Sequence, residues 1–287
     1  LVYQVIESSD KINFNDYKSL NVDLQTIMDA EQIAIGTFSP LTGFMNKEEI
    51  EFVLDNYKLT NGIIWPLPIY CQINNKEFSE LSLGDSIVLK LNNVDEPFAI
   101  ISIEQMYNLN LNQMSIKMFR TDDVKHPGVR RLFEKGNCFI SGKVELIRRI
   151  PSKYKYYEIT PAESRQILEN KGWSRVAGFH TRNIPHRVHE YIQTYVLDNY
   201  LCDGLFIHPV VGPKKTGDYM PEIIIESYQL LIDNNLAERS LLAAFQSYSR
   251  YAGPREAVFT ALCRKNFGCS HFIIGRDHTG VGDYYSN

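Results

Sequence analysis

Two histidines stand three residues apart in the stretch GFHTRNIPHRVHEYI, which spans residues 178–192. If a helix begins near Pro185, His186 and His189 lie on adjacent turns of one face, because residues three apart are neighbours on a helix. The first turn of a helix also offers unpaired backbone N–H groups and the positive end of the helix dipole. A phosphate bound there would meet those donors and both imidazoles, with Arg182 in the preceding loop. The stretch therefore predicts an anion site.

Two other interpretations of the same histidines stay open at this point. A zinc site could take both imidazoles, with Glu190 nearby, but the hydrolase patterns H-E-x-x-H and H-x-x-E-H are absent. No C-x-x-C pair supplements the histidines, so we expect no protein-bound metal. Alternatively, both imidazoles could be packed side chains whose ring nitrogens are satisfied. Asn183 could serve as the cap of the helix.

Three further stretches combine cationic residues with glycine. HPVVGPKKTGD contains Lys214 and Lys215 but lacks the Walker A spacing, so these lysines would act only as point charges on a polyphosphate. GRDHTGVGD places Arg276 among three glycines, where backbone can approach a nucleotide and the guanidinium can bind two oxyanion oxygens. RYAGPRE contains Arg250 and Arg255, which could contact a ligand or form structural salt bridges.

These stretches are rich in cations and poor in nucleophiles. No G-x-S-x-G elbow is present, and no cysteine joins a histidine in a known signature. Such a set is typical of phosphoryl or nucleotidyl transfer, in which positioning and charge stabilisation do most of the catalysis.

The second half of the chain alternates between two patterns. Strand-like runs occur at residues 173–180, 203–210, 240–247 and 270–277, and a helix-like run follows each of the first three. This alternation predicts right-handed βαβ units and a parallel sheet. Ligands of such sheets bind beyond the carboxyl ends of the strands. Since every cationic stretch follows a predicted strand, we expect one shared crevice lined by Arg182, His186, His189, Lys214, Lys215, Arg250, Arg255, Arg276 and His278.

The first half of the chain has a different character. Short runs rich in Ile, Val, Phe and Tyr alternate with turn residues, as in LGDSIVLKL, EPFAIISIEQMY and GNCFISGKVELIRRI. Helices are expected around residues 23–33 and 46–57. We predict a β-rich domain over residues 1–155 and an α/β domain over residues 156–287.

Composition limits the classes of partner. The net charge of −4 and a pI near 6.0 argue against a broad basic surface for nucleic acid. The five cysteines form no C-x-x-C pair, which is typical of a reducing compartment. No apolar run approaches the length of a membrane span, and the first residues do not resemble a signal peptide. We expect a cytoplasmic protein with neither nucleic-acid nor membrane partners.

The same stretches resemble motifs of the ATP sulfurylase (sulfate adenylyltransferase) family. TRN followed by HRVHE is similar to that family's Q-T-R-N…H-R-A-H-E motif. HPVVGPKKTGD, YSRYAGPREA and GRDHTGVGDYY resemble its other blocks, in the family's order, and FSPLTGFM, WPLPI, HPGVRRLF and ITPAESR extend the resemblance over nearly the whole chain. It implies a PUA-like domain followed by a Rossmann-like nucleotidyltransferase domain. It also implies adenylyl transfer from ATP to sulfate in sulfate assimilation, giving adenosine 5′-phosphosulfate and pyrophosphate, with Mg²⁺ bound with the ATP.

The resemblance also implies roles for particular residues. By the motif match, catalytic positions are held by Thr181, Arg182, Asn183, His186 and His189. Sulfate would contact His180, Arg182 and Thr279. The nucleotide would contact Arg182, His186, His189, Gly275, Arg276, Asp277 and His278. We expect a homo-oligomer.

Three departures from the family pattern keep alternatives open. His180 stands where the family has Gln, and Thr279 stands where Ala is commoner. Because both would line the oxyanion pocket, an adenylyltransferase with a different oxyanion acceptor is one alternative. Family members also continue beyond GVGDYY with a small carboxyl-terminal closing domain, which we expect to be absent here. A non-catalytic nucleotide-binding relative is therefore a second alternative.

Overall fold

The computed structural model describes residues 1–7, 13–92, 94–213, 217–275, 278 and 281–285. Contacts within the chain divide it into two compact units. The parallel-sheet unit contains Leu1, Pro151–Ser249 and Thr260–Gly275. The mixed-sheet unit contains Val2–Ile150, Arg250–Phe259 and Arg276–Asn287. Among the described residues, every helix is too short or too polar to serve as a transmembrane span.

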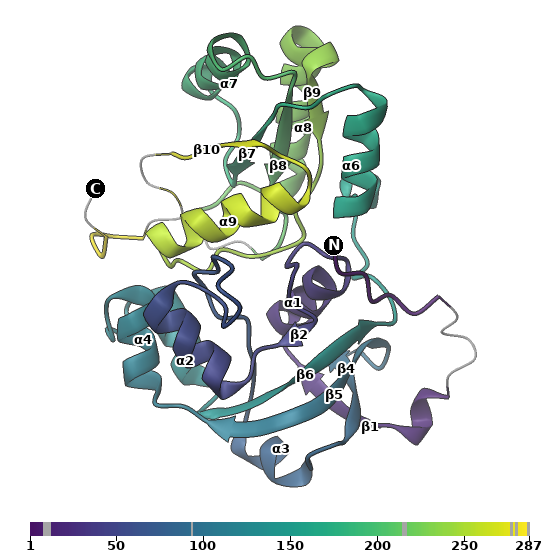
Figure 1. The fold of residues 1–287 in the computed structure, drawn as a ribbon, viewed down its shortest axis with the longest axis vertical. Helices are drawn as coiled ribbons and strands as arrows, with labels where there is room; N and C mark the ends of the chain where they lie inside the picture. Colours follow the sequence, from purple (N-terminus) through teal and green to yellow (C-terminus); the bar gives the residue numbers. More distant parts are fainter. Residues whose placement is uncertain (8–12, 93, 214–216, 276–277, 279–280, 286–287) are drawn as a thin grey trace. The chain divides into compact units, whose positions relative to one another are not determined.

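The parallel-sheet unit has the predicted βαβ architecture (Figure 1). Its sheet runs in the order β10-β7-β8-β9, and each neighbouring pair is parallel. The strands are β7 (Val176–Thr181), β8 (Gly204–Pro209), β9 (Ser240–Leu242) and β10 (His271–Ile273). The helices are α6 (Pro161–Asn170), α7 (Arg187–Asn199), α8 (Pro221–Leu231) and the later part of α9 (Pro254–Asn266). Short helical turns occur at Lys155–Tyr157, Ile232–Leu236 and Ala237–Arg239.

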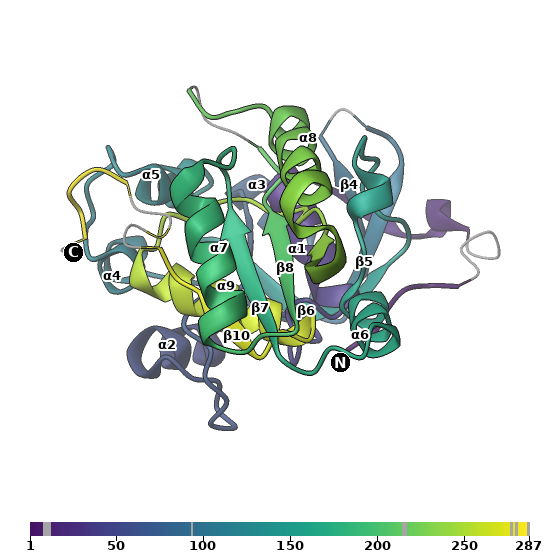
Figure 2. The ribbon, with the colours of Figure 1, turned by 90° about the horizontal axis from the view of Figure 1, so that it is seen from above.

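Helices cover both faces of this sheet (Figure 2). On one face, side chains of α7 and α8 pack against the odd-numbered residues of β7 and β8, in a core formed by Ala177, Phe179, Leu197, Leu205, Ile207, Ile224 and Tyr228. On the other face, the core contains Leu168 of α6, Val176, Phe206, Phe267 and Cys269. Because successive side chains of a strand point to opposite faces, Gly178 and His180 lie on this second face. Gly178 packs there against Arg264 of α9.

Local sequence signals place the helices. Thr160 and Glu163 form a reciprocal capping box at the start of α6, with Pro161 at the first helical position. Pro221 begins α8 in the same way. The strands at the sheet edges are shorter than predicted, since only Ser240–Leu242 and His271–Ile273 pair as strands among the described residues.

The mixed-sheet unit is built on a strongly bent sheet in the order β1-β4-β5-β6-β2, with β3 also paired to β6. Its strands are β1 (Lys18–Val22), β2 (Gly43–Phe44), β3 (Cys71–Ile73), β4 (Ser86–Leu91), β5 (Pro97–Asn108) and β6 (Cys138–Leu146). The β1–β4 pair is parallel, whereas the pairs that β4, β5, β6, β2 and β3 form with one another are antiparallel. The helices are α1 (Leu24–Ala34), α2 (Lys47–Asn56), α3 (Asn75–Glu80), α4 (Leu111–Phe119) and α5 (Pro127–Glu134), and a short turn occupies Phe14–Asp16. The predicted helices near 23–33 and 46–57 are confirmed as α1 and α2.

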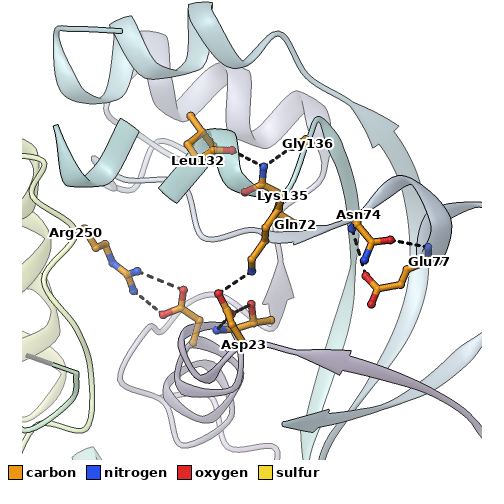
Figure 3. Close-up of polar contacts among 10 residues, drawn as sticks. Asp23, Gln72, Asn74, Glu77, Leu132, Lys135, Gly136 and Arg250 are labelled. Carbon is orange, nitrogen blue, oxygen red and sulfur yellow. Dashed lines mark hydrogen bonds and ion pairs between the residues drawn. The ribbon is translucent and has the colours of Figure 1, made fainter. Parts of the chain in front are cut away.

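Polar side chains connect the elements of this unit (Figure 3). Buried Gln72 on β3 donates from Nε2 to the carbonyl oxygen of Leu132 at 2.7 Å and also to that of Gly136. Lys135 forms a 2.8 Å ion pair with Asp23, the residue that caps α1. These contacts link β3 and the end of α5 to the rest of the unit.

Candidate active site

The carboxyl end of β7 turns sharply at Thr181. This residue is buried, and its hydroxyl oxygen accepts a hydrogen bond from the backbone N–H of Asn183 at 3.1 Å. Its backbone carbonyl accepts from the N–H of Val210 at 2.9 Å, which ties the end of β7 to the end of β8. A hydroxyl bonded to backbone two residues later stabilises a tight turn. Thr181 and Asn183 therefore fix the backbone from which half-buried Arg182 projects.

His186 and His189 lie together at the start of α7. The helix begins at Arg187 rather than near Pro185, and His186 is its N-cap residue. The two rings stack with centroids 3.8 Å apart and an interplanar angle of 26°. The alternative in which Asn183 caps the helix is wrong, because the N-cap is His186 and no side chain caps the helix. The helix therefore presents its first N–H groups beside two imidazoles, as predicted for an anion site.

His189 lies between the histidine pair and the core. Its ring contacts the Phe179 ring edge to face at a centroid distance of 5.4 Å. Burial lowers the pKa of His189 below its ordinary value, and the nearby His186 lowers this pKa further. Its Nδ1 atom is buried and has no partner in hydrogen-bonding geometry among the described residues. The interpretation of this ring as a packed side chain with satisfied nitrogens is therefore wrong, and a ligand acceptor could satisfy it.

The histidine pair does not belong to a metal cluster in the described part of the chain. No group of three or more His, Cys, Asp or Glu side chains is arranged there to hold an ion. The donors at this end of the sheet are guanidinium, imidazole and backbone N–H groups, which suit an anion better than a cation.

His180 and Gly275 also lie toward this end of the sheet. Half-buried His180 pairs in register with His208 of β8. Ile273 of β10 pairs with Phe179, so the chain that leaves β10 toward exposed Gly275 passes the edge where β7 ends.

Several predicted site residues cannot be placed relative to this turn. Arg276, Asp277, Thr279, Lys214 and Lys215 lie outside the described residues. His278 is half-buried in a turn and groups with the mixed-sheet unit. The single crevice shared by Arg182 and Arg276 stays a prediction.

Arg250 and Arg255 are structural within the mixed-sheet unit, so the prediction that they line the ligand crevice is wrong. The Arg250 guanidinium forms two hydrogen bonds to the Asp29 carboxylate, at 2.6 and 3.3 Å, and both side chains are almost fully buried (Figure 3). Arg255 donates to the backbone carbonyls of Pro66 and Leu54 at 2.7 and 2.6 Å. Their donors are used in holding α1 and α2 to the segment 250–259.

Sequence reasoning missed two buried polar residues on the second face of the parallel sheet. His208 is 1% exposed and lies among the rings of Phe206, Phe245 and Phe267. Arg264 is fully buried and donates to the carbonyl of His208 at 2.8 Å. A histidine within the apolar run DGLFIHPV was the available signal. Arg264 resembles an ordinary basic residue near a helix end, where cations complement the dipole.

Comparison with known proteins divides the chain in the same order. A family model described as ATP-sulfurylase matches residues 155–287, and one described as PUA-like domain matches residues 1–149. A sulfate adenylyltransferase of Nostoc punctiforme is 43% identical over 268 residues, covering 93% of this chain and 68% of that protein. A sulfate adenylyltransferase of Pyrococcus abyssi is 40% identical, covering 94% of this chain and 70% of that protein.

A solved structure shares the fold at low sequence identity. It is titled a hexameric APS kinase from Thiobacillus denitrificans, and it superposes with a TM-score of 0.78 at 23% identity. The match covers 96% of this chain but only 52% of that one, so this chain spans about half of the solved protein.

Proposed function

The chain belongs to the ATP-sulfurylase family, and from this membership we propose that it transfers the adenylyl group of ATP to sulfate. The products are adenosine 5′-phosphosulfate and pyrophosphate. The observation that supports this function best is the meeting of Arg182, His186 and His189 at the turn from β7 to α7, within the residues matched by the family.

The reaction sets a requirement that these residues meet. A sulfate oxygen forms a new bond to the α-phosphorus, the bond from that phosphorus to the bridging oxygen breaks, and pyrophosphate leaves with the electron pair. Sulfate is already ionised at neutral pH, so no general base is needed. The main obstacle is repulsion between two anions held in line, which fixed cations and N–H donors can offset.

Arg182 has the central role in this proposal. Its guanidinium, half-buried above the Thr181 turn, binds a sulfate oxygen and an α-phosphate oxygen together. Thr181 and Asn183 position it through their tight turn rather than by touching the reacting atoms. His180, on the neighbouring strand position, donates a ring N–H to sulfate.

His186 and His189 hold the leaving group. The unpartnered Nδ1 of His189 and the uncapped start of α7 support contacts to the β-phosphate and the departing pyrophosphate. Because its pKa is lowered, His189 acts at neutral pH as a neutral hydrogen-bond donor. Gly275, Arg276, Asp277 and His278 bind the nucleotide, and the backbone at Thr279 contacts sulfate, by their match to the family motif.

The residues at this turn fit a divalent ion that arrives with ATP. The family's chemistry uses such an ion, which we propose to be Mg²⁺, and the described residues offer no cluster of protein ligands for it. It would then be held by the polyphosphate and by water, with Arg182 and the two histidines around the complex. When bound, the ion neutralises part of the polyphosphate charge.

Several broader features accompany the proposed function. We propose the domain boundaries 1–155 for the PUA-like domain and 156–287 for the catalytic domain, and a cytoplasmic location. We also propose a homo-oligomer, supported by the hexameric title of the structural neighbour.

The direct test is pyrophosphate release from ATP that depends on sulfate. Arg182→Ala is expected to lower kcat/KM by about a hundredfold to a thousandfold, the usual effect of losing one oxyanion donor. Arg175→Ala is the matched control, because Arg175 is an exposed cation at the opposite end of the same strand. Equal activities of the two variants would contradict the role of Arg182. ATP binding without turnover would favour the non-catalytic alternative.

A different oxyanion acceptor is the second candidate function. His180 supports it, because a histidine ring replaces the family's Gln at the penultimate position of β7. Sulfate, selenate, molybdate and phosphate compared as acceptors would separate the two candidates. A clear preference for sulfate removes the second one.

A further inference from the structure

Arg264 is a buried cation without a counterion among the described residues. Its side chain is 0% exposed. Its Nη2 donates to the carbonyl of His208 at 2.8 Å, and its guanidinium lies 4.4 Å from the centroid of the Phe245 ring. Within the described residues, Nε and Nη1 have no hydrogen-bond partner, although both are buried. Burial of an unpaired charge is unfavourable, so this arrangement calls for an explanation.

The groups next to Arg264 do not neutralise it. Burial raises the pKa of the Cys269 thiol to about 12, so this neighbour is protonated at neutral pH. Burial lowers the pKa of Arg264 only to about 10, and the arginine therefore keeps its charge. Burial and the charge of Arg264 hold the pKa of His208 well below its ordinary value, so that ring is neutral.

The charge lies beneath the strand ends that form the candidate active site. Gly178 leaves room for the stem of Arg264, because a Cβ at position 178 would lie 3.0 Å from its Cγ. His180 follows Gly178 by two residues, on the same face of β7 and roughly 7 Å further along the strand. His180 also pairs in register with His208, whose carbonyl accepts from Arg264. The guanidinium is thus adjacent to the residue proposed to contact sulfate.

We propose that Arg264 is a positioning residue for the oxyanion, whose unpaired buried charge strengthens dianion binding at the end of β7. The inference rests on the proposed function, because sulfate is the dianion that this site would take. The charge acts over several ångströms of protein interior, where screening by salt is weak. The bound dianion then serves as the missing counterion. The hydrogen bond to the His208 carbonyl fixes where the charge lies.

Arg250 provides the contrast that the experiment needs. It is also a buried arginine, but its charge is neutralised by Asp29. A purely structural arginine should affect stability without affecting anion affinity. Arg264 is expected to affect both.

The test compares three variants of the full chain: Arg264→Gln, Arg264→Lys and Arg250→Gln. Calorimetric titration with sodium sulfate gives Kd, and initial rates at saturating ATP give KM for sulfate and kcat. Arg264→Gln is expected to raise Kd and KM for sulfate about tenfold, a modest effect for a charge at this range, while kcat changes by less than about twofold. Arg264→Lys, which keeps the charge, is expected to recover most of the affinity. Arg250→Gln is expected to lower the unfolding midpoint and leave Kd for sulfate unchanged.

The outcomes separate this inference from the proposed function. An active wild type whose Arg264→Gln variant keeps the wild-type Kd overturns the inference alone. A wild type that binds sulfate without releasing pyrophosphate overturns the proposed function, and the titration of Arg264→Gln still decides the inference. A wild type that does not bind sulfate overturns both. If Arg264→Gln does not fold, Gly178→Ala displaces the arginine stem instead, and an unchanged KM for sulfate in that variant overturns the inference.

Discussion

The imidazole rings of His186 and His189 are stacked 3.8 Å apart where α7 begins. One ring belongs to the N-cap residue and the other to the first turn, so a single ligand can contact both rings and the free N–H groups of the helix. The pair therefore acts as one unit in binding an anion.

Because the two histidines act as a unit, their substitutions should not add. His186→Ala and His189→Ala are each expected to lower kcat about a hundredfold, by loss of one oxyanion donor. The double variant should lose less than the product of the single losses. Pyrophosphate release measured for all four proteins gives the coupling. Strictly multiplicative losses would contradict a shared ligand.

The buried His208 ring should make stability fall in mild acid. Its pKa in the folded state is well below 6.5, so below pH 6.5 the unfolded chain binds a proton that the folded protein refuses. Stability is therefore full above pH 6.5 and declines as the pH falls below it, by at most about 1.4 kcal/mol per pH unit for this group. Urea unfolding of wild type and His208→Gln between pH 5 and 7.5 should show a smaller slope in the variant. His271→Gln, at a partly exposed histidine of β10, is the control and should keep the wild-type slope.

The buried pair of Arg250 and Asp29 should be costly to break on one side only. Arg250→Met leaves the Asp29 carboxylate buried and unpaired, and is expected to lower the free energy of unfolding by about 3–5 kcal/mol. The double variant Arg250→Met with Asp29→Leu should recover a large part of that loss. The control is Lys18→Ala, which removes an exposed ion pair to Asp85 and should cost less than about 1 kcal/mol. Similar losses for Arg250→Met and Lys18→Ala would contradict the buried pair.

Gly43 should be intolerant of any side chain for steric reasons. A Cβ on residue 43 would lie 1.9 Å from the carbonyl oxygen of Gly142, on the strand that β2 pairs with. Gly43→Ala is expected to destabilise the mixed-sheet unit by about 1–3 kcal/mol or more, as overpacking does. Gly62→Ala separates this effect from backbone strain, because Gly62 has a φ of +86° but a Cβ added there would meet no atom within 4 Å. Thermal unfolding of the two variants should rank Gly43→Ala as the less stable.

The parallel sheet and its ligand edge could be predicted because their signals are local. The βαβ alternation, proline at helix starts and cations after strand ends each lie within a few residues of sequence. Arg182, His186 and His189 therefore came together at the predicted edge. The start of α7 was misplaced by two residues, since the tight turn at Thr181 keeps the backbone extended as far as His186.

The roles of the buried arginines could not be read in this way. Arg250 and Asp29 are separated by 221 residues, and no local pattern announces their pairing. Arg264 and His208 face each other across a helix and a strand, 56 residues apart. A cation in a polar segment looks alike whether it meets a carboxylate, a carbonyl or a ligand, and only the folded chain distinguishes these cases.

The grouping of segment 250–259 with the first part of the chain has a consequence for dissecting the protein. An expression fragment cut near residue 150 would carry Arg250 and Arg255 but would leave behind the Asp29 carboxylate and the Pro66 and Leu54 carbonyls that receive them. Two guanidinium groups would then lose these acceptors, beside an orphaned patch around Phe259. Severing the polypeptide at its apparent seam would therefore not yield an intact half.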